Sequence, residues 1–354
     1  MSIKLIFKEE NKKYYEELWN QFLVQHEVDF TYSLPLIAYY LSTSTNIFSD
    51  KSFVLELDNK CVGICFLPIE KIDEKLSISI SGGYTISPLA NTSKNEKFLF
   101  DIIDTISLEL NLVTVHFKLS IFQENKYNKL LTHNFLDTTN HTCTINLLNT
   151  QEQLWMNLRK CYKALINSLI KNNLFHIEYS DTSNFTELHN QYVSFHKIHM
   201  INAGKIPKSD TIYNQQLNLI KENKASIITV KYNDRVVIAN YFFHDNINVI
   251  YASSAYDTNE YFKDLPLNHY LLWNAILHFK AKNYKILGFG QPCSFSTIDS
   301  FDNYANEKEL SISHFKKGIG VEIIQNMQGI KFFDKTLLLQ KINQFKLGVE
   351  NEFK

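Results

Sequence analysis

The amino-acid sequence predicts a mixed α/β protein made of two similar halves, with residues 1–150 and 151–354 as its two domains. The chain has 354 residues, 45% of them hydrophobic, which is enough to bury two hydrophobic cores of ordinary size. Both halves also contain the same order of predicted elements: a helix, a β-hairpin, a strand, a second helix and a further strand. This shared order, and not sequence identity between the halves, is the basis for inferring a duplication.

Apolar residues at strand or helix spacing define the elements of the first half. The clearest element is a hairpin, in which strands at 53–57 and 62–67 are joined by a polar turn at 58–60. A strand at 76–81 runs into two glycines, where a turn is expected. The remaining predicted elements are strands at 3–7, 112–117 and 143–147 and helices at 12–26 and 98–110.

The second half repeats this order after a long helical pattern at 151–172. Thr150 is placed to cap that helix and Gln153 follows three residues later, and we expect the helix to bridge the two domains. A hairpin is predicted at 225–232 and 236–244. The other predicted elements are helices at 185–199, 211–223 and 266–282 and strands at 249–255 and 284–289.

Three stretches of the second half carry a family signal when they are taken in order. An amphipathic hairpin covers 236–257, a helix and a strand cover 266–290, and the segment HFKKGIG occupies 314–320. Together they resemble the second half of a tandem GNAT acyltransferase of the FemAB-like group. The resemblance covers roughly residues 150–330 and implies two tandem GNAT-like domains, with an acyl-CoA site in the C-terminal one.

Composition limits the partners and the compartment. The sequence contains no apolar run of 18 residues and no N-terminal secretory pattern, so we expect a soluble, cytoplasmic protein. Lys and Arg number 36 against 37 Asp and Glu, and only Arg159 and Arg235 are arginines. This balance disfavours a nucleic-acid partner, because proteins that grip a phosphate backbone normally carry a basic excess.

The five cysteines have no paired metal-ligand spacing, so we expect reduced, mostly buried thiols. Cys61 and Cys65 are four residues apart in a predicted strand and should share one face. His189, His196 and His199 fall near one face of a predicted helix, but no carboxylate or cysteine completes a ligand set, and no metal is expected.

The resemblance implies that acyl-CoA lies between the strand that ends near Asp257 and the strand at 284–289. Strands that splay there would offer backbone partners to the donor, and the start of the helix at 266 would face its pyrophosphate. The segment 259–268 departs from the family, because it has no glycine and one lysine. The residues expected to bind the cofactor are Tyr251 and Ser253, on one strand face, and Asn268, His269 and Tyr270.

Lys316 is the residue that the resemblance favours most for catalysis, because it occupies the lysine position of the family's Phe-Lys element. A lysine there could stabilise an oxyanion, and its place beside a predicted turn suggests little burial. His199, at the end of its helix, and Asp257 are the other catalytic candidates. Gln291 and His314 are expected to contact the acceptor substrate.

Three classes of function remain open. The first is acyl-CoA dependent N-acylation of a small molecule, and here the architecture is similar to double-GNAT enzymes that acylate a nucleotide-linked deoxyamino sugar for lipopolysaccharide O-antigen. The second is a Fem-type ligase that adds an amino acid from aminoacyl-tRNA to a peptidoglycan precursor. The third is a non-catalytic GNAT-like binding protein. The first is favoured, by direct attack in a ternary complex, since no cysteine has the partner that a covalent route needs.

Overall fold

The computed structural model describes residues 3–290 and 292–352, which divide into two compact units. Unit 1 consists of Met1–Asn140, Ser296–Asn306 and Gln325–Lys354, and unit 2 consists of His141–Phe295 and Glu307–Ile324. The domain boundary expected at residue 150 stays a prediction. The two compact units differ from the expected domains because each is assembled from separate segments of the chain. The chain returns from unit 2 to unit 1 twice, at Ser296–Asn306 and at Gln325–Lys354, so neither unit is one continuous stretch.

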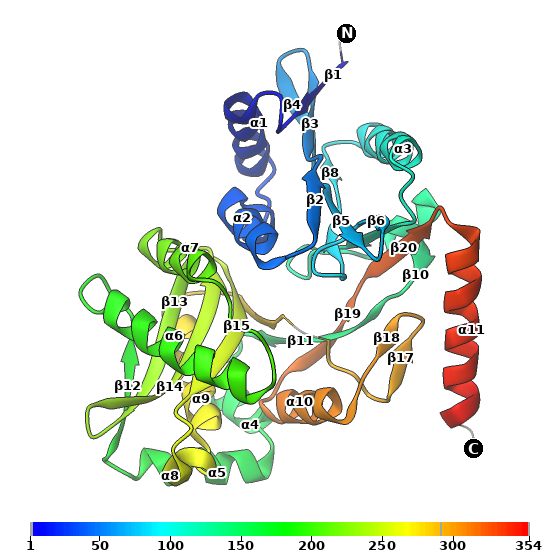
Figure 1. Ribbon diagram of the computed structural model, residues 1–354. Coiled ribbons are helices and arrows are strands. Elements are labelled where there is room, and N and C mark those ends of the chain that lie inside the picture. The colour runs from blue at the N-terminus through cyan, green and yellow to red at the C-terminus, as the bar shows by residue number, and fades with distance from the viewer. Residues whose placement is uncertain (1–2, 291, 353–354) are drawn as a thin grey trace. The chain divides into compact units, whose positions relative to one another are not determined.

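The strands of unit 1 form two larger sheets and a small hairpin (Figure 1). The first sheet has the order β1 (Ile3–Phe7), β3 (Phe53–Leu57), β4 (Lys60–Cys65) and β8 (Leu89–Ala90). The second has the order β10 (Leu136–Asp137), β20 (Gln328–Phe332), β9 (Thr114–Lys118), β6 (Lys75–Ile78), β5 (Pro68–Ile72) and β2 (Ile47–Asp50), with β7 (Thr85–Ile86) also on β9. β17 (Ile298–Ser300) and β18 (Asn303–Tyr304) form the hairpin.

The predicted elements of the first half are confirmed, with additions. Four α-helices lie among the described residues of unit 1: α1 (Lys12–Gln25), α2 (Leu34–Thr43), α3 (Ser93–Glu109) and α11 (Lys335–Glu352). The predicted turn between β3 and β4 has positive φ at both Asp58 and Asn59, which is the backbone that a tight hairpin requires. The predicted strand at 143–147 is present as β11 (Asn140–Asn146), but it joins the sheet of unit 2.

Cys61 and Cys65 do not share a face of β4, contrary to the prediction from their spacing. Both thiols are buried, but Cys61 packs in the cluster that holds Trp19 of α1, and Cys65 packs in the cluster that holds Leu99 of α3. The pairing of β3 with β4 shifts register next to Glu56. Such a bulge adds one residue to the strand and reverses the alternation beyond it.

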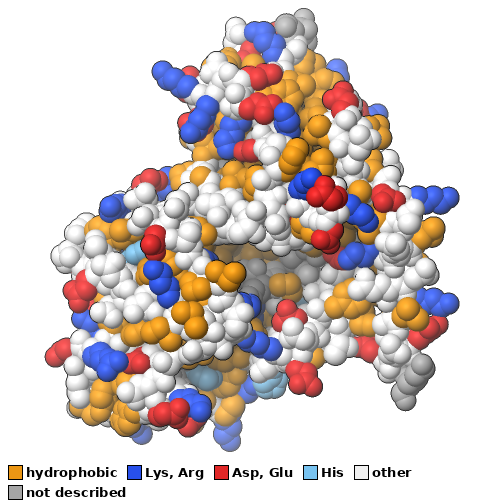
Figure 2. Space-filling view, viewed as in Figure 1, with side chains coloured by type: hydrophobic (Ala, Val, Ile, Leu, Met, Phe, Trp, Pro, Cys, Tyr) orange, Lys and Arg blue, Asp and Glu red, His pale blue; other side chains and the backbone are white. Residues whose placement is uncertain are grey.

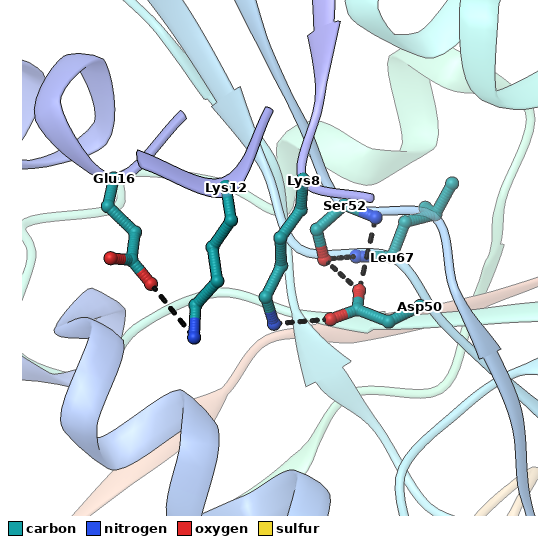
Figure 3. A network of polar contacts seen from close by, with 6 residues as sticks. All are labelled: Lys8, Lys12, Glu16, Asp50, Ser52 and Leu67. Atoms are coloured by element: carbon teal, nitrogen blue, oxygen red, sulfur yellow. Dashed lines mark hydrogen bonds and ion pairs between the residues drawn. The ribbon is translucent and has the colours of Figure 1, made fainter. Parts of the chain in front are cut away.

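An ion pair and hydrogen bonds link the ends of edge strands in unit 1 (Figure 3). Lys8 Nζ lies 2.6 Å from Asp50 Oδ2, and Asp50 Oδ1 accepts hydrogen bonds from the N–H and the hydroxyl of Ser52. The Ser52 hydroxyl in turn accepts from the N–H of Leu67 at 3.0 Å. The chain after β1 is thereby linked to the turns that follow β2 and β4.

The described strands of unit 2 form one mixed sheet. Its order is β12 (Phe175–Tyr179), β13 (Ala225–Tyr232), β14 (Arg235–His244), β15 (Asn248–Tyr256), β16 (Ile286–Phe289), β11 and β19 (Glu322–Asn326). β14 and β15 are antiparallel, and β15 and β16 are parallel. The predicted hairpins and the neighbouring strands around residues 236–290 are therefore confirmed.

Helices cover both faces of this sheet, as adjacent residues of β14 demonstrate. Tyr241 contacts Tyr192 of α6 (Phe185–Asn202), with 5.7 Å between ring centroids. Phe242 points the opposite way and contacts Phe279 of α9 (Leu267–Ala281) at 5.2 Å. α7 (Asp210–Lys221) packs on β13, and α5 (Lys160–Ile170) packs on α9.

The long helix predicted at 151–172 is two helices. α4 (Gln151–Asn157) opens with the expected capping box of Thr150 and Gln153, but Leu158 and Arg159 are extended before α5 begins. Leu158 is buried in the core of unit 2, and the Arg159 N–H donates to Gly318 O at 2.9 Å instead of to a helical carbonyl. Tertiary contacts thus interrupt a pattern that is continuous in the sequence.

The surface agrees with the near-zero net charge. Figure 2 shows Lys and Arg side chains scattered among Asp and Glu over the visible face. Within residues 3–290 and 292–352, none of the helices combines the length and the apolar character needed to cross a membrane.

Candidate functional site

The neighbouring strands β15 and β16 part at one end, and this opening is the centre of the candidate site. They pair in parallel from Asn248↔Ile286 to Tyr251↔Phe289. β15 continues to Tyr256 while it remains paired with β14 on its other edge. Among the described residues, no strand pairs with the β16 side of β15 beyond Tyr251. Its backbone N–H and C=O groups are available there to a ligand that lies along the strand.

A β-bulge at Ala252 determines which face of the sheet each side chain of β15 points to at this opening. The partners on β14 change from Ser253 opposite Tyr241 to Tyr251 opposite Phe242, so Ala252 is the extra residue. Tyr251 therefore faces α9, with its ring 5.6 Å from that of Phe289. Ser253 faces α6, where its hydroxyl lies 2.7 Å from that of Tyr192. The prediction that Tyr251 and Ser253 share a face was wrong, because alternation fails across a bulge.

The N-terminus of α9 lies over the same end of the sheet. Pro266 is its N-cap residue and supplies no capping side chain. Asn268 accepts from Asn240 Nδ2 at 2.9 Å, and its own Nδ2 lies 3.5 Å from the Tyr251 hydroxyl. Asn240 is fully buried on β14, and its Oδ1 has no hydrogen-bond partner among the described residues. Burial raises the pKa of Tyr251.

The other two residues predicted at this helix end are packed inside unit 2. The His269 ring lies 4.3 Å from that of Tyr162 and 5.0 Å from that of Phe315, and burial lowers the pKa of His269. Tyr270 is buried, and His269 is partly buried. An anion at this end of α9 would therefore meet backbone N–H groups of the first turn rather than these two side chains.

Lys316 is buried, whereas its place beside a predicted turn suggested little burial. It lies near the end of α10 (Glu307–Gly318), is 5% exposed, and its Nζ donates to the carbonyl oxygen of Pro292 at 3.4 Å. Pro292 follows β16, and Gly290 between them lies beside Tyr251. The amine is thus held near the segment that follows β16, the strand from which β15 parts. Burial lowers the pKa of Lys316, and the nearby thiols of Cys143 and Cys293 act in the opposite direction.

The glycines of the FKKGIG segment explain why Lys316 is buried. A β-carbon on Gly318 would lie 2.3 Å from Cε2 of Tyr162, so only glycine allows α10 to approach α5 this closely. Gly320 has φ +82 and lies against the backbone of Asn157. The motif read from the sequence as a functional signature is therefore also a packing motif that fixes the end of α10.

The Cys143 thiol near Lys316 is a poor nucleophile. Cys143 and Cys293 are fully buried, and neither forms a disulfide. A hydrogen bond with Cys293, followed by burial, raises the pKa of Cys143. A thiol held in its protonated form is unsuited to attack an acyl group.

The remaining predicted residues take different places. Asp257, at the end of β15, is bound by Arg235 Nη2 at 2.6 Å and by the Asn259 N–H at 3.0 Å. His199 packs against Tyr256 at 5.1 Å, and burial lowers its pKa. The exposed His314 contacts Arg159 through Nε2 at 2.7 Å. Gln291 lies outside the described residues.

Asn240 is the site residue that the sequence interpretation missed. It lies in the middle of an otherwise apolar strand and is fully buried. The sequence signal for Asn240 is a single amide among the apolar residues of a central strand, because a buried polar group needs a hydrogen-bond partner.

The fold has known counterparts among solved structures. FemX is 11% identical, with 96% of this chain and 99% of that chain covered and a TM-score of 0.65. L-PGS from Bacillus licheniformis is 12% identical, with 89% and 96% covered and a TM-score of 0.52. A tandem GNAT protein from the clavulanic acid biosynthesis pathway is 6% identical, with 94% and 98% covered and a TM-score of 0.49.

No family model and no curated protein sequence matches the chain. At these identities the structural likeness concerns the fold alone: the chain has the fold of FemX, which confirms the predicted mixed α/β class.

Proposed function

We propose that this protein is an N-acyltransferase that moves an acyl group from acyl-CoA to an amine, and that the amine belongs to a nucleotide-linked deoxyamino sugar. The observation that carries the proposal is the opening between β15 and β16 beyond the Tyr251↔Phe289 pair, with the buried amine of Lys316 against the segment that follows β16. An open strand edge beside a buried cation is suited to an acyl group on an amide-rich carrier.

The donor would lie along the free edge of β15. The pantetheine arm of CoA contains amide groups that can pair with backbone N–H and C=O groups as an added strand does. The first turn of α9, which has no side-chain cap, would meet an anionic part of the donor through its N–H groups. The α8 helix (Glu260–Lys263) stands where a glycine-rich phosphate loop would be, so backbone contacts would hold most of the donor.

The chemistry requires a neutral amine and a stabilised oxyanion. The amine nitrogen attacks the thioester carbonyl carbon, the C–S bond breaks as the amide forms, and the amine gives up one proton while CoA leaves as the thiol. Lys316 in its protonated form would donate to the carbonyl oxygen as negative charge develops on it. His199 stays a candidate base, because its lowered pKa keeps the imidazole neutral near pH 7.

A Fem-type activity is the second candidate, and one observation favours it. The fold agrees with that of FemX over 96% of this chain. In that case the activated acyl group would be an aminoacyl ester on tRNA and the acceptor a peptidoglycan precursor. The balance of 36 basic and 37 acidic residues weighs against it, since binding of tRNA is driven largely by phosphate neutralisation.

A transfer assay separates the two candidates. The purified protein is incubated with a panel of acyl-CoAs and nucleotide amino sugars, free thiol is followed over time, and the acylated sugar is identified by mass. Charged tRNA with a peptidoglycan precursor forms the parallel arm. Thiol release that depends on one amino sugar supports the proposal. Transfer only from charged tRNA would replace it with the Fem-type activity.

A further inference from the structure

Unit 2 contains a pocket on the β14 side of β15, away from the edge that faces β16. It is a shallow, largely open pocket of about 350 Å³ at the turn between β13 and β14. Residues of this turn and of the α8 region line it: Tyr232, Asn233, Arg235, Asn259, Tyr261 and Phe262. Pockets for small ligands hold about 300–1,000 Å³, so this one suits a single compact group rather than an extended cofactor.

Aromatic rings form one wall of the pocket. The ring of Tyr232 lies 5.4 Å from those of Tyr261 and Phe262, and 5.1 Å from that of Phe175 on β12. Phe262 is buried, whereas Tyr261 is 58% exposed. The rings of Tyr232 and Phe262 thus support the exposed ring of Tyr261 at the rim of the pocket. Such an aromatic surface can stack against a planar heterocycle.

Among the described residues that line the pocket, Arg235 is the cation, and it lies beside these rings. Arg235 Nη2 lies 2.6 Å from Asp257 Oδ2, and the side chain of Asp257 is 9% exposed while that of Arg235 is 62% exposed. The buried carboxylate holds the guanidinium in place, and the exposure of the side chain leaves N–H groups for a second anion. Arginine is also rare in this chain, which otherwise uses lysine for its cations. A fixed guanidinium fits phosphate oxygens better than a flexible ammonium does.

We propose that this pocket binds a nucleotide, with its base on Tyr261 and Tyr232 and its phosphate on Arg235. The inference rests on the proposed function, in which both substrates carry such a group: the adenosine 3′-phosphate end of CoA and the nucleoside diphosphate of the amino sugar. Their shared chemistry is a heteroaromatic base that carries a phosphate. Arg235 is joined through Asp257 to the end of β15, so the pocket lies beside the strand whose opposite edge forms the opening.

Calorimetry on the full chain tests this site without turnover. The probes are uridine 5′-monophosphate, for the acceptor, and adenosine 3′,5′-bisphosphate, for the donor, with uridine and adenosine as phosphate-free references. Tyr261→Leu removes the exposed ring and should weaken the bound nucleotide about tenfold or more, as loss of a stacking contact does. Arg235→Gln should reduce the preference for nucleotide over nucleoside. Arg235→Gln also removes the ion pair with Asp257 and could prevent folding. In that case the result for Tyr261→Leu alone tests the inference.

Matched controls lie outside the pocket. Tyr127→Leu removes a tyrosine that is 65% exposed in unit 1, and Lys263→Gln removes a cation from α8 that does not line the pocket. Neither change should alter affinity. Binding of uridine monophosphate alone assigns the pocket to the acceptor, and binding of the adenosine bisphosphate alone assigns it to the donor.

The inference is overturned if neither nucleotide binds, or if Tyr261→Leu binds as the unchanged protein does. Its failure differs from failure of the proposed function. A protein that binds a nucleotide here but transfers no acyl group would contradict the activity and keep the site. If Tyr261→Leu transfers acyl groups with unchanged KM values, the proposed activity stands and the nucleotide site is contradicted.

Discussion

The side-chain nitrogen of Lys316 lies 3.4 Å from the carbonyl oxygen of Pro292, in the segment that follows β16. A buried ammonium needs hydrogen-bond acceptors, and this carbonyl provides one. Because the contact joins the end of α10 to the end of β16, the position of the amine depends on the packing of α10.

Replacing Lys316 by Met should lower kcat/KM by tens to hundreds of fold, which corresponds to about 2–3 kcal/mol of transition-state stabilisation. The thermal midpoint should be unchanged or slightly higher, because Met fills similar space without a buried charge. Steady-state kinetics and a melting curve check both points. Lys317→Met is the matched control, since the Lys317 amine lies over the exposed ring of Phe295 at 4.2 Å. Equal rates for the two variants would contradict the role of Lys316.

Replacing Gly318 by Ala should destabilise unit 2 by about 1–3 kcal/mol, because the new methyl group would overlap the Tyr162 ring at 2.3 Å. Urea denaturation measures the loss. Combining the change with Tyr162→Leu should recover part of it, because the smaller side chain makes room for the methyl group. A double variant no more stable than Gly318→Ala would show that the clash is not the cause.

Two buried histidines of α6 should make stability depend on pH. His189 and His196 each have a pKa lowered to about 4 by burial. As pH falls below about 6.5, the unfolded chain binds protons that the folded chain excludes, so the free energy of unfolding should decrease between pH 6.5 and 4. Each site contributes up to about 1.4 kcal/mol per pH unit. In urea titrations, His189→Leu should flatten this slope, and an unchanged slope would contradict the assignment.

Glu70 should stabilise unit 1 through a fully bonded carboxylate. It is buried and accepts hydrogen bonds from the hydroxyls of Ser44 and Ser79 and from the N–H groups of Ser81 and Gly82. Burial raises the pKa of Glu70 but these bonds lower it further, so the net pKa lies below its usual value and stability should fall under acid conditions. Glu70→Gln presents an NH₂ group to donors and should cost about 1–3 kcal/mol. The exposed Glu74→Gln serves as the control in the same denaturation assay.

Much of the fold could be predicted from the sequence because its signals are local. The hairpins of β3–β4 and β13–β14 have polar turn residues with positive φ between apolar strands, and α1 buries Tyr15, Leu18 and Phe22 at helical spacing. The return of β20 to the sheet of unit 1 depends on contacts between residues 328–332 and 114–118, which no local pattern encodes.

The candidate site was predicted less completely, and bulges are one physical reason. The strand predicted at 249–255 is present as β15, yet one extra residue at Ala252 sends Tyr251 and Ser253 to opposite faces. The burial of Lys316 depended on the fit of Gly318 to Tyr162, two residues that lie far apart in the sequence. Register and helix-to-helix fit are tertiary properties, so periodicity alone could not reveal them.

Hydrogen–deuterium exchange of the peptide that covers 249–257, with and without acyl-CoA, tests the central claim most directly. If the donor lies along the open edge of β15, amides beyond Tyr251 should become protected on binding, while those of β13, which already has strands on both edges, should not change. Protection confined to 249–257 and the start of α9 is the predicted result. Acyl-CoA that leaves this peptide unprotected, or charged tRNA that alone protects it, would contradict the account.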